Sequence, residues 1–161
     1  MSTPTGPPRS RRGPSIALAI GAGLTAATLI AVAVDQVLGL SIARHALALY
    51  APIGFDSGEA IPLFIYLYAV GGTALVFWAV ILWGVWRRRR GARIVASLLV
   101  AAIATIAMPT LLFEEFGGSV YPTFWGVAGI VPVFAGLVGM IWLWMLPVAR
   151  PNPPRIAAAA S

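Results

Sequence analysis

WRRRRGAR, residues 86–93, is the densest charge cluster of the chain. An apolar run from Ala60 to Val85 precedes it, and another from Ile94 to Phe113 follows it. An arginine at the centre of a bilayer costs roughly 2.5 kcal/mol or more. The cluster therefore predicts a short aqueous turn between two membrane spans, on the cytoplasmic side, because loop arginines set orientation. The residues expected to determine the topology are Arg87, Arg88, Arg89, Arg90 and Arg93.

The composition indicates that lipid is the solvent for much of the surface. Hydrophobic residues make up 60% of the 161 residues and charged residues only 10%, whereas soluble domains are nearer half apolar and a quarter charged. One small core cannot bury that much apolar surface. The length suits one compact bundle without a separate soluble domain.

Four apolar segments are long enough to cross about 30 Å of hydrocarbon, which takes about 20 helical residues. We therefore predict an all-α integral membrane protein, a four-helix bundle with short loops in residues 15–146. The expected spans are residues 16–40, 60–86, 94–113 and 123–146. Residues 1–14 and 147–161 are rich in proline and arginine, and we expect disordered cytoplasmic tails there.

The distribution of charge predicts the orientation. With the N-terminus inside, the cytoplasmic segments hold ten of the eleven arginines, and the outer side holds Arg44 and all five acids. This asymmetry favours an even number of spans, with both termini in the cytoplasm and the protein in the plasma membrane. Every basic residue except His45 is arginine, which we interpret as the codon bias of a GC-rich bacterium.

The net charge of +6 does not indicate nucleic acid as a partner, because it is confined to short segments beside apolar runs. We expect these segments to contact anionic lipid headgroups at the cytoplasmic face, at about 1 kcal/mol per residue.

Several kinds of chemistry are excluded. The chain has no cysteine, so it has no disulfides, thiolate metal ligands or thiol relays. It has one histidine, so a single chain cannot ligate a haem through two histidines. No Ser-His-Asp, Walker or zincin pattern is present. We therefore expect no catalytic residues, no cofactor and no metal.

A second interpretation of the N-terminal region remains open. The pattern has the shape of a secretory signal peptide that is cleaved after Ala33. It consists of arginines in residues 9–12, an apolar run from Ile16 to Ile30 and the small residues 31–33. The apolar character continues to Leu40. Cleavage would leave the topology of the remaining spans unchanged.

Local patterns predict further detail. Gly23, Ala27 and Ala31 form a small-residue stripe that lets another helix approach closely. Pro109 is expected to kink the third span, and Pro132 to bend the fourth. Residues 41–50 are expected to form an interfacial helix. Its apolar residues Ile42, Leu47 and Leu49 would lie in the membrane surface, and Arg44 and His45 would face the headgroups.

The candidate site is the outer mouth of the bundle. Its residues are Asp35, Arg44, His45, Glu59, Glu114 and Glu115. Carboxylates with one imidazole could bind a divalent cation, relay protons or hold a basic ligand. The simpler interpretation is structural: Asp56 and Glu59 cap the start of the second span, and the others are solvated loop charges.

Three of these residues are unusual. Asp35 has apolar neighbours and needs a partner, for which Arg44 is the only outer arginine. Glu114 and Glu115 follow the C-terminal end of a span, where the helix dipole disfavours negative charge. A cation, a neighbouring helix start or water would have to compensate them.

Three functions follow from these features. The first is a non-enzymatic accessory or self-associating membrane component, with a membrane-protein partner or a homo-oligomer. The second is a small transporter or channel for protons, cations or a basic solute, with an acidic outer vestibule. The third is a metal-binding redox accessory or intramembrane enzyme that uses His45 and the acids.

Overall fold

The computed structural model describes residues 12–39, 41–54, 60–87 and 91–146. The long helices of this part are α1 (Arg12–Leu38), α3 (Ala60–Trp86), α4 (Ala92–Ala107), continued by the short α5 (Pro109–Leu112), and α6 (Thr123–Met145). The shorter elements are α2 (Ile42–Tyr50), a 3₁₀ turn (Ala51–Ile53), β1 (Glu114–Glu115) and β2 (Gly118–Ser119).

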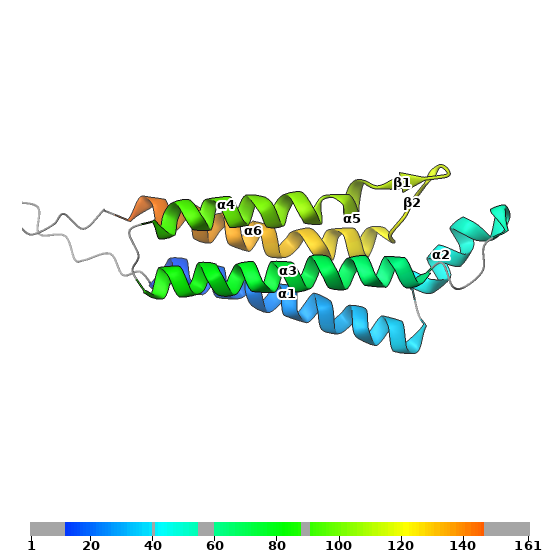
Figure 1. Ribbon diagram of the computed structural model, residues 1–161, viewed down its shortest axis with the longest axis horizontal. Helices are drawn as coiled ribbons and strands as arrows, with labels where there is room; N and C mark the ends of the chain where they lie inside the picture. The colour runs from blue at the N-terminus through cyan, green and yellow to red at the C-terminus, as the bar shows by residue number, and fades with distance from the viewer. Residues whose placement is uncertain (1–11, 40, 55–59, 88–90, 147–161) are drawn as a thin grey trace, which may run out of the picture.

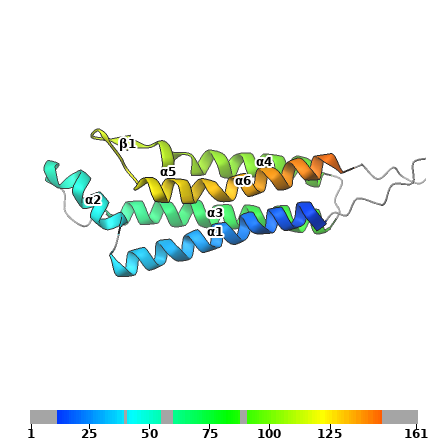
Figure 2. The same cartoon turned by 180° about the vertical axis from the view of Figure 1, so that it is seen from behind.

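The four long helices form an up-and-down bundle (Figures 1 and 2). Helix α1 packs against α3 and α6, and α4 packs against the same two helices, so the order around the bundle is α1–α3–α4–α6. The prediction of an all-α four-helix bundle is confirmed.

The bundle has two chemically different ends. We call the end where α3 finishes and α4 begins the arginine end; α1 begins and α6 finishes there too. We call the opposite end the hairpin end, because β1 and β2 lie there together with α2 (Figure 1).

Each long helix is suited to a membrane. The candidate spans have 26, 27, 21 and 23 residues, and 21 residues at 1.5 Å each cover about 32 Å. Their outward faces carry large apolar side chains such as Ile65, Leu98 and Phe134. Because a helix that is apolar on all sides needs an apolar environment, the fold fits a multi-pass membrane protein.

Trp78 is the centre of the main core. Its side chain is completely buried, and Nε1 donates to Thr25 Oγ1 at 3.0 Å. The ring lies where α1 and α6 carry glycines: a Cβ on Gly21 would lie 2.9 Å from it, and a Cβ on Gly136 would collide with it. Both glycines are therefore needed for α1, α3 and α6 to pack around this indole.

Helix α1 begins four residues earlier than the predicted span. Residues 12–14, expected in a disordered tail, are helical. Pro14 does not prevent this, because proline is tolerated in the first turn of a helix, where its missing N–H would have no partner. This turn also packs against α6, since a Cβ on Gly13 would contact the Trp142 ring. The helix ends at Leu38, because Gly39 adopts a positive φ of 59°. The rest of both predicted tails lies outside the described residues.

The two prolines act differently. At Pro109 the third span is interrupted, and α5 continues from α4 after Met108. Pro132 lies inside α6 and leaves the Ala128 carbonyl without its usual donor. Thr28 Oγ1 of α1 lies 3.4 Å from that oxygen and 3.0 Å from Leu24 O, so one hydroxyl on a neighbouring helix is within reach of both carbonyls.

Candidate functional site

Asp35 caps the start of α2. Its Oδ1 accepts hydrogen bonds from Ser41 N at 2.8 Å and Ser41 Oγ at 2.7 Å, and its Oδ2 accepts one from Ile42 N at 3.0 Å. Ser41 occupies the N-cap position but makes no side-chain cap bond, so the carboxylate of the preceding helix replaces it. A carboxylate that is only 5% exposed is stabilised here by the positive end of the α2 dipole.

The predicted pairing of Asp35 with Arg44 is wrong. Arg44 is exposed, and its Nε donates to Gly39 O at 3.3 Å. The physical reason is proximity: the turn after Gly39 presents two backbone N–H groups and a hydroxyl to the carboxylate in fixed geometry, whereas the exposed arginine would have to be desolvated to reach it.

Trp125 connects the α1–α2 corner, which is the turn where Asp35 caps α2, to α6. Its Nε1 donates to Ser41 Oγ at 2.8 Å, and Ser41 in turn donates to Asp35. The indole packs in a second apolar cluster with Val32, Ile42 and Phe64. Ile42, predicted to lie in the membrane surface, is instead completely buried in the protein, because the α1–α2 turn directs the first residue of α2 inward.

A β-hairpin that the sequence did not predict joins α5 to α6. Glu114 pairs with Ser119 and Glu115 with Gly118, so the turn consists of Phe116 and Gly117. Their φ values are +51° and +79°, and a type I′ turn needs positive φ at both positions. Phenylalanine is unusual there, and its ring packs edge-on against Tyr50 at 6.0 Å.

Helix α2 is attached to this hairpin by two polar contacts. His45 Nε2 lies 2.7 Å from Ser119 O, and Tyr50 OH donates to Glu115 Oε2 at 2.7 Å. Because a carbonyl oxygen only accepts, Nε2 carries the proton. His45 therefore contacts the protein rather than the lipid headgroups that the sequence predicted. The negative charge of Glu115 is stabilised by a hydrogen bond from the phenol of Tyr50 rather than by a cation.

The structure brings Asp35, Arg44, His45, Glu114 and Glu115 to the same end of the bundle. They do not form one site: Asp35 belongs to the α1–α2 corner, His45 and Glu115 to the α2–hairpin contact, and Glu114 is exposed. Glu59 and Asp56, with the predicted capping box, lie outside the described residues. Among the residues described, no three His, Cys, Asp or Glu side chains are close enough to hold a metal ion.

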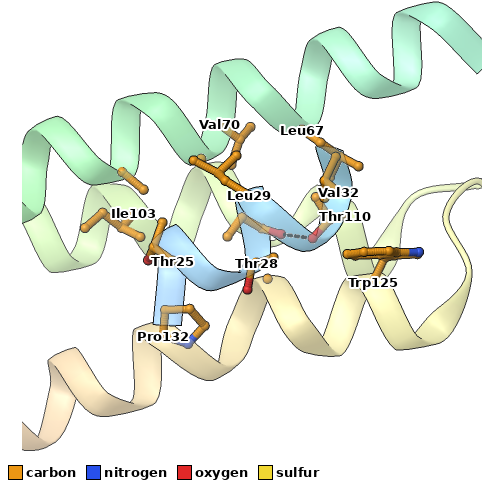
Figure 3. A pocket seen from close by; sticks show the side chains of 14 residues that line it. Thr25, Thr28, Leu29, Val32, Leu67, Val70, Ile103, Thr110, Trp125 and Pro132 are labelled. Carbon is orange, nitrogen blue, oxygen red and sulfur yellow. Dashed lines mark hydrogen bonds between the residues drawn. The ribbon is translucent and has the colours of Figure 1, made fainter. Parts of the chain in front are cut away.

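A small cavity lies between the long helices, on the hairpin side of Trp78. Its volume is about 50 Å³. Figure 3 shows Trp125 at one end of it and Thr25 and Pro132 towards the other. Thr28 and Thr110 also line it, with aliphatic side chains and glycines from α1, α3, α4 and α6.

The arginine end has its own network. Arg93 Nη2 donates to Leu146 O, and the guanidinium lies 6.0 Å from the Trp144 ring centre. Trp144 Nε1 donates to Ser97 Oγ at 3.0 Å. Arg93 thus joins the start of α4 to the end of α6, in addition to its predicted role in topology. Arg87 is exposed and lies 5.8 Å from the Trp83 ring centre; Arg88, Arg89 and Arg90 lie outside the described part.

Tyr121 is expected to make stability fall in alkali. It is buried between β2 and α6, its OH donates to Leu63 O at 3.3 Å, and burial followed by the neighbouring Tyr66 raises its pKa well above the usual value of about 10. The folded protein keeps this proton where the unfolded chain has lost it, so the free energy of unfolding declines as pH rises above about 10.

Chemical denaturation in detergent at pH 8 to 11 measures this effect. Tyr121→Phe should weaken the alkaline decline, while at pH 8 it should lose only the bond to Leu63, about 1 kcal/mol. An equally steep alkaline decline in both proteins would contradict the assignment.

Comparisons with known proteins identify no relative: no protein-family model, no curated protein and no solved structure matches the chain. The class that the fold itself defines is a small multi-pass α-helical membrane protein.

Proposed function

We propose that this chain is a non-enzymatic component of a bacterial plasma membrane that acts by contact with another membrane protein or with a second copy. One observation carries this proposal: the polar side chains best suited to chemistry are used to hold the molecule together. Asp35 is bonded to the start of α2, His45 to a hairpin carbonyl and Glu115 to Tyr50. These contacts favour a rigid polar cap over an open acidic vestibule.

The contact face that we propose lies on α1. Gly23, Ala27 and Ala31 are all exposed on the outside of the bundle, and a Cβ on Gly23 would meet nothing within 4 Å. The helices in the described part of the chain therefore leave the stripe uncovered. Small residues spaced by four let a second helix approach closely in a membrane, which supports a partner helix here.

Substitution of Gly23 tests this face. Gly23→Leu should abolish the partner or dimer band that cross-linking in native membranes and co-purification in mild detergent reveal, because a leucine keeps the second backbone away. Gly72→Leu on α3 is the matched control, since Gly72 also has open space around it. If neither a partner nor a dimer is found, or if both variants behave alike, the proposed face is excluded.

We also propose that the arginine end faces the cytoplasm. Arg87 and Arg93 lie there, while Asp35, Glu114 and Glu115 lie at the hairpin end, and loop arginines favour the cytoplasmic side. The exposed guanidinium of Arg87, beside Trp83, supports contact with anionic lipid headgroups.

Single cysteines test the orientation, because the chain has none of its own. A membrane-impermeant maleimide should label Ala51→Cys in intact cells and Gly91→Cys only after permeabilisation. Leu98→Cys, on a lipid-facing surface, serves as the unlabelled control. Labelling of Gly91→Cys from outside would reverse the orientation.

A transporter or channel for protons, cations or a basic solute is the second candidate, and the carboxylates of Asp35, Glu114 and Glu115 at the hairpin end support it. Such transport would use the carboxylates of this outer end, Asp35 among them. Proteoliposome flux assays separate the two functions: Asp35→Asn should abolish flux in a transporter, whereas partner binding by an accessory protein should persist.

A further inference from the structure

The wall of the cavity is mainly carbon. Leu29, Val32, Leu67, Val70 and Ile103 supply aliphatic surface from three of the four long helices. The wall also contains polar side chains, but their hydrogen-bond donors already have acceptors within the protein.

Three threonine hydroxyls lie within hydrogen-bond distance of backbone carbonyls. Thr25 donates to Gly21 O at 3.0 Å, and Thr110 donates to Ala107 O at 2.6 Å. Thr28 Oγ1 lies 3.0 Å from Leu24 O. The indole N–H of Trp125 donates to Ser41. The donors of these four side chains therefore already have acceptors, and Thr25 Oγ1 also accepts from Trp78, which disfavours water and favours an apolar occupant.

Size limits the occupant further. An apolar cavity of about 150 Å³ binds benzene, so a cavity of 50 Å³ has room for about two carbons. A complete solute does not fit, but the end of a hydrocarbon chain does. The surrounding bilayer supplies such chains at high concentration.

Helix α1 diverges from α3, α4 and α6 towards the hairpin end, which Figures 1 and 2 both show. The residues of α1 that line the cavity, from Thr25 to Val32, belong to this diverging half. We propose that the cavity binds the methyl end of a hydrocarbon chain of a membrane lipid, which enters beside α1. This lipid site is independent of the proposed function.

The experiment uses the full chain in nanodiscs with two probes. One is a phosphatidylglycerol with a diazirine at the methyl end of its acyl chain, and the other is an isoprenyl phosphate with a diazirine at the corresponding end. After irradiation, mass spectrometry maps the adducts. Adducts on Leu29, Val70 or Ile103 are expected, and the probe that produces them identifies an acyl or an isoprenoid chain.

Two variants fill the cavity, and a third variant serves as the control. Ala107→Leu adds three carbons to the wall and Val70→Leu adds one, while Ala101→Leu makes the same change as the first on an exposed face of α4. Adducts on the wall should be lost in Ala107→Leu, reduced in Val70→Leu and unchanged in Ala101→Leu, with thermal unfolding verifying that each variant is folded. Adducts confined to exposed residues such as Leu98, or wall adducts that persist in both folded filling variants, would overturn the proposal. The absence of adducts together with higher stability on filling would overturn it too, since the cavity would then be only a packing void.

Discussion

Trp78→Ala is expected to lower the free energy of unfolding by about 3–5 kcal/mol, the usual loss when a fully buried tryptophan is truncated. The indole fills the centre of the core, and its N–H bonds to Thr25. Equilibrium unfolding in detergent measures the loss. Trp86→Ala, on the same helix but 79% exposed, should change stability by only about 0.5 kcal/mol.

A double-mutant cycle shows whether the ring of Trp78 is the reason that position 136 has to be glycine. Gly136→Ala alone places a methyl group against Trp78 and should cost about 1–3 kcal/mol by overpacking. In the Trp78→Ala background the same change has room and should cost little, so the two effects should not add. Additive effects would show that Gly136 serves another purpose.

Asp35→Ala should cost about 2–3 kcal/mol, because the carboxylate is the acceptor for three donors at a buried position. The loss should be local: hydrogen exchange of the amides of Ser41 and Ile42 should accelerate, and α2 should open before the bundle does.

Asp35→Asn is the matched variant for this position. It keeps one acceptor oxygen and should lose roughly half as much stability, since the charge–dipole term disappears and part of the hydrogen bonding remains. Equal protection of α2 in all three proteins would show that the apolar contacts of Ile42 alone hold the corner.

The bundle itself could be predicted because membrane spans depend on short-range properties. Length and hydropathy define each helix, and the arginine cluster after Trp86 predicts where one span ends and the next begins. These features are readable within about 25 residues of sequence.

The contacts of the polar residues could not be predicted because they depend on distant segments. Ser41 meets Trp125 and His45 meets Ser119 only after all four helices have packed. Arg44 was the nearest opposite charge to Asp35 along the chain, but the turn at Gly39 placed backbone donors closer. Phe116 gave no signal for a type I′ turn, because that turn usually has Asn or Gly at this position.

The contacts between α2 and the hairpin also set an order of assembly. His45 and Tyr50 leave the ribosome long before Ser119 and Glu115. During biogenesis, α2 therefore remains incompletely docked until the hairpin has been synthesised and the last helix has packed. A nascent chain stalled before β2 would present α2 to proteases, and completion of the fourth span would protect it.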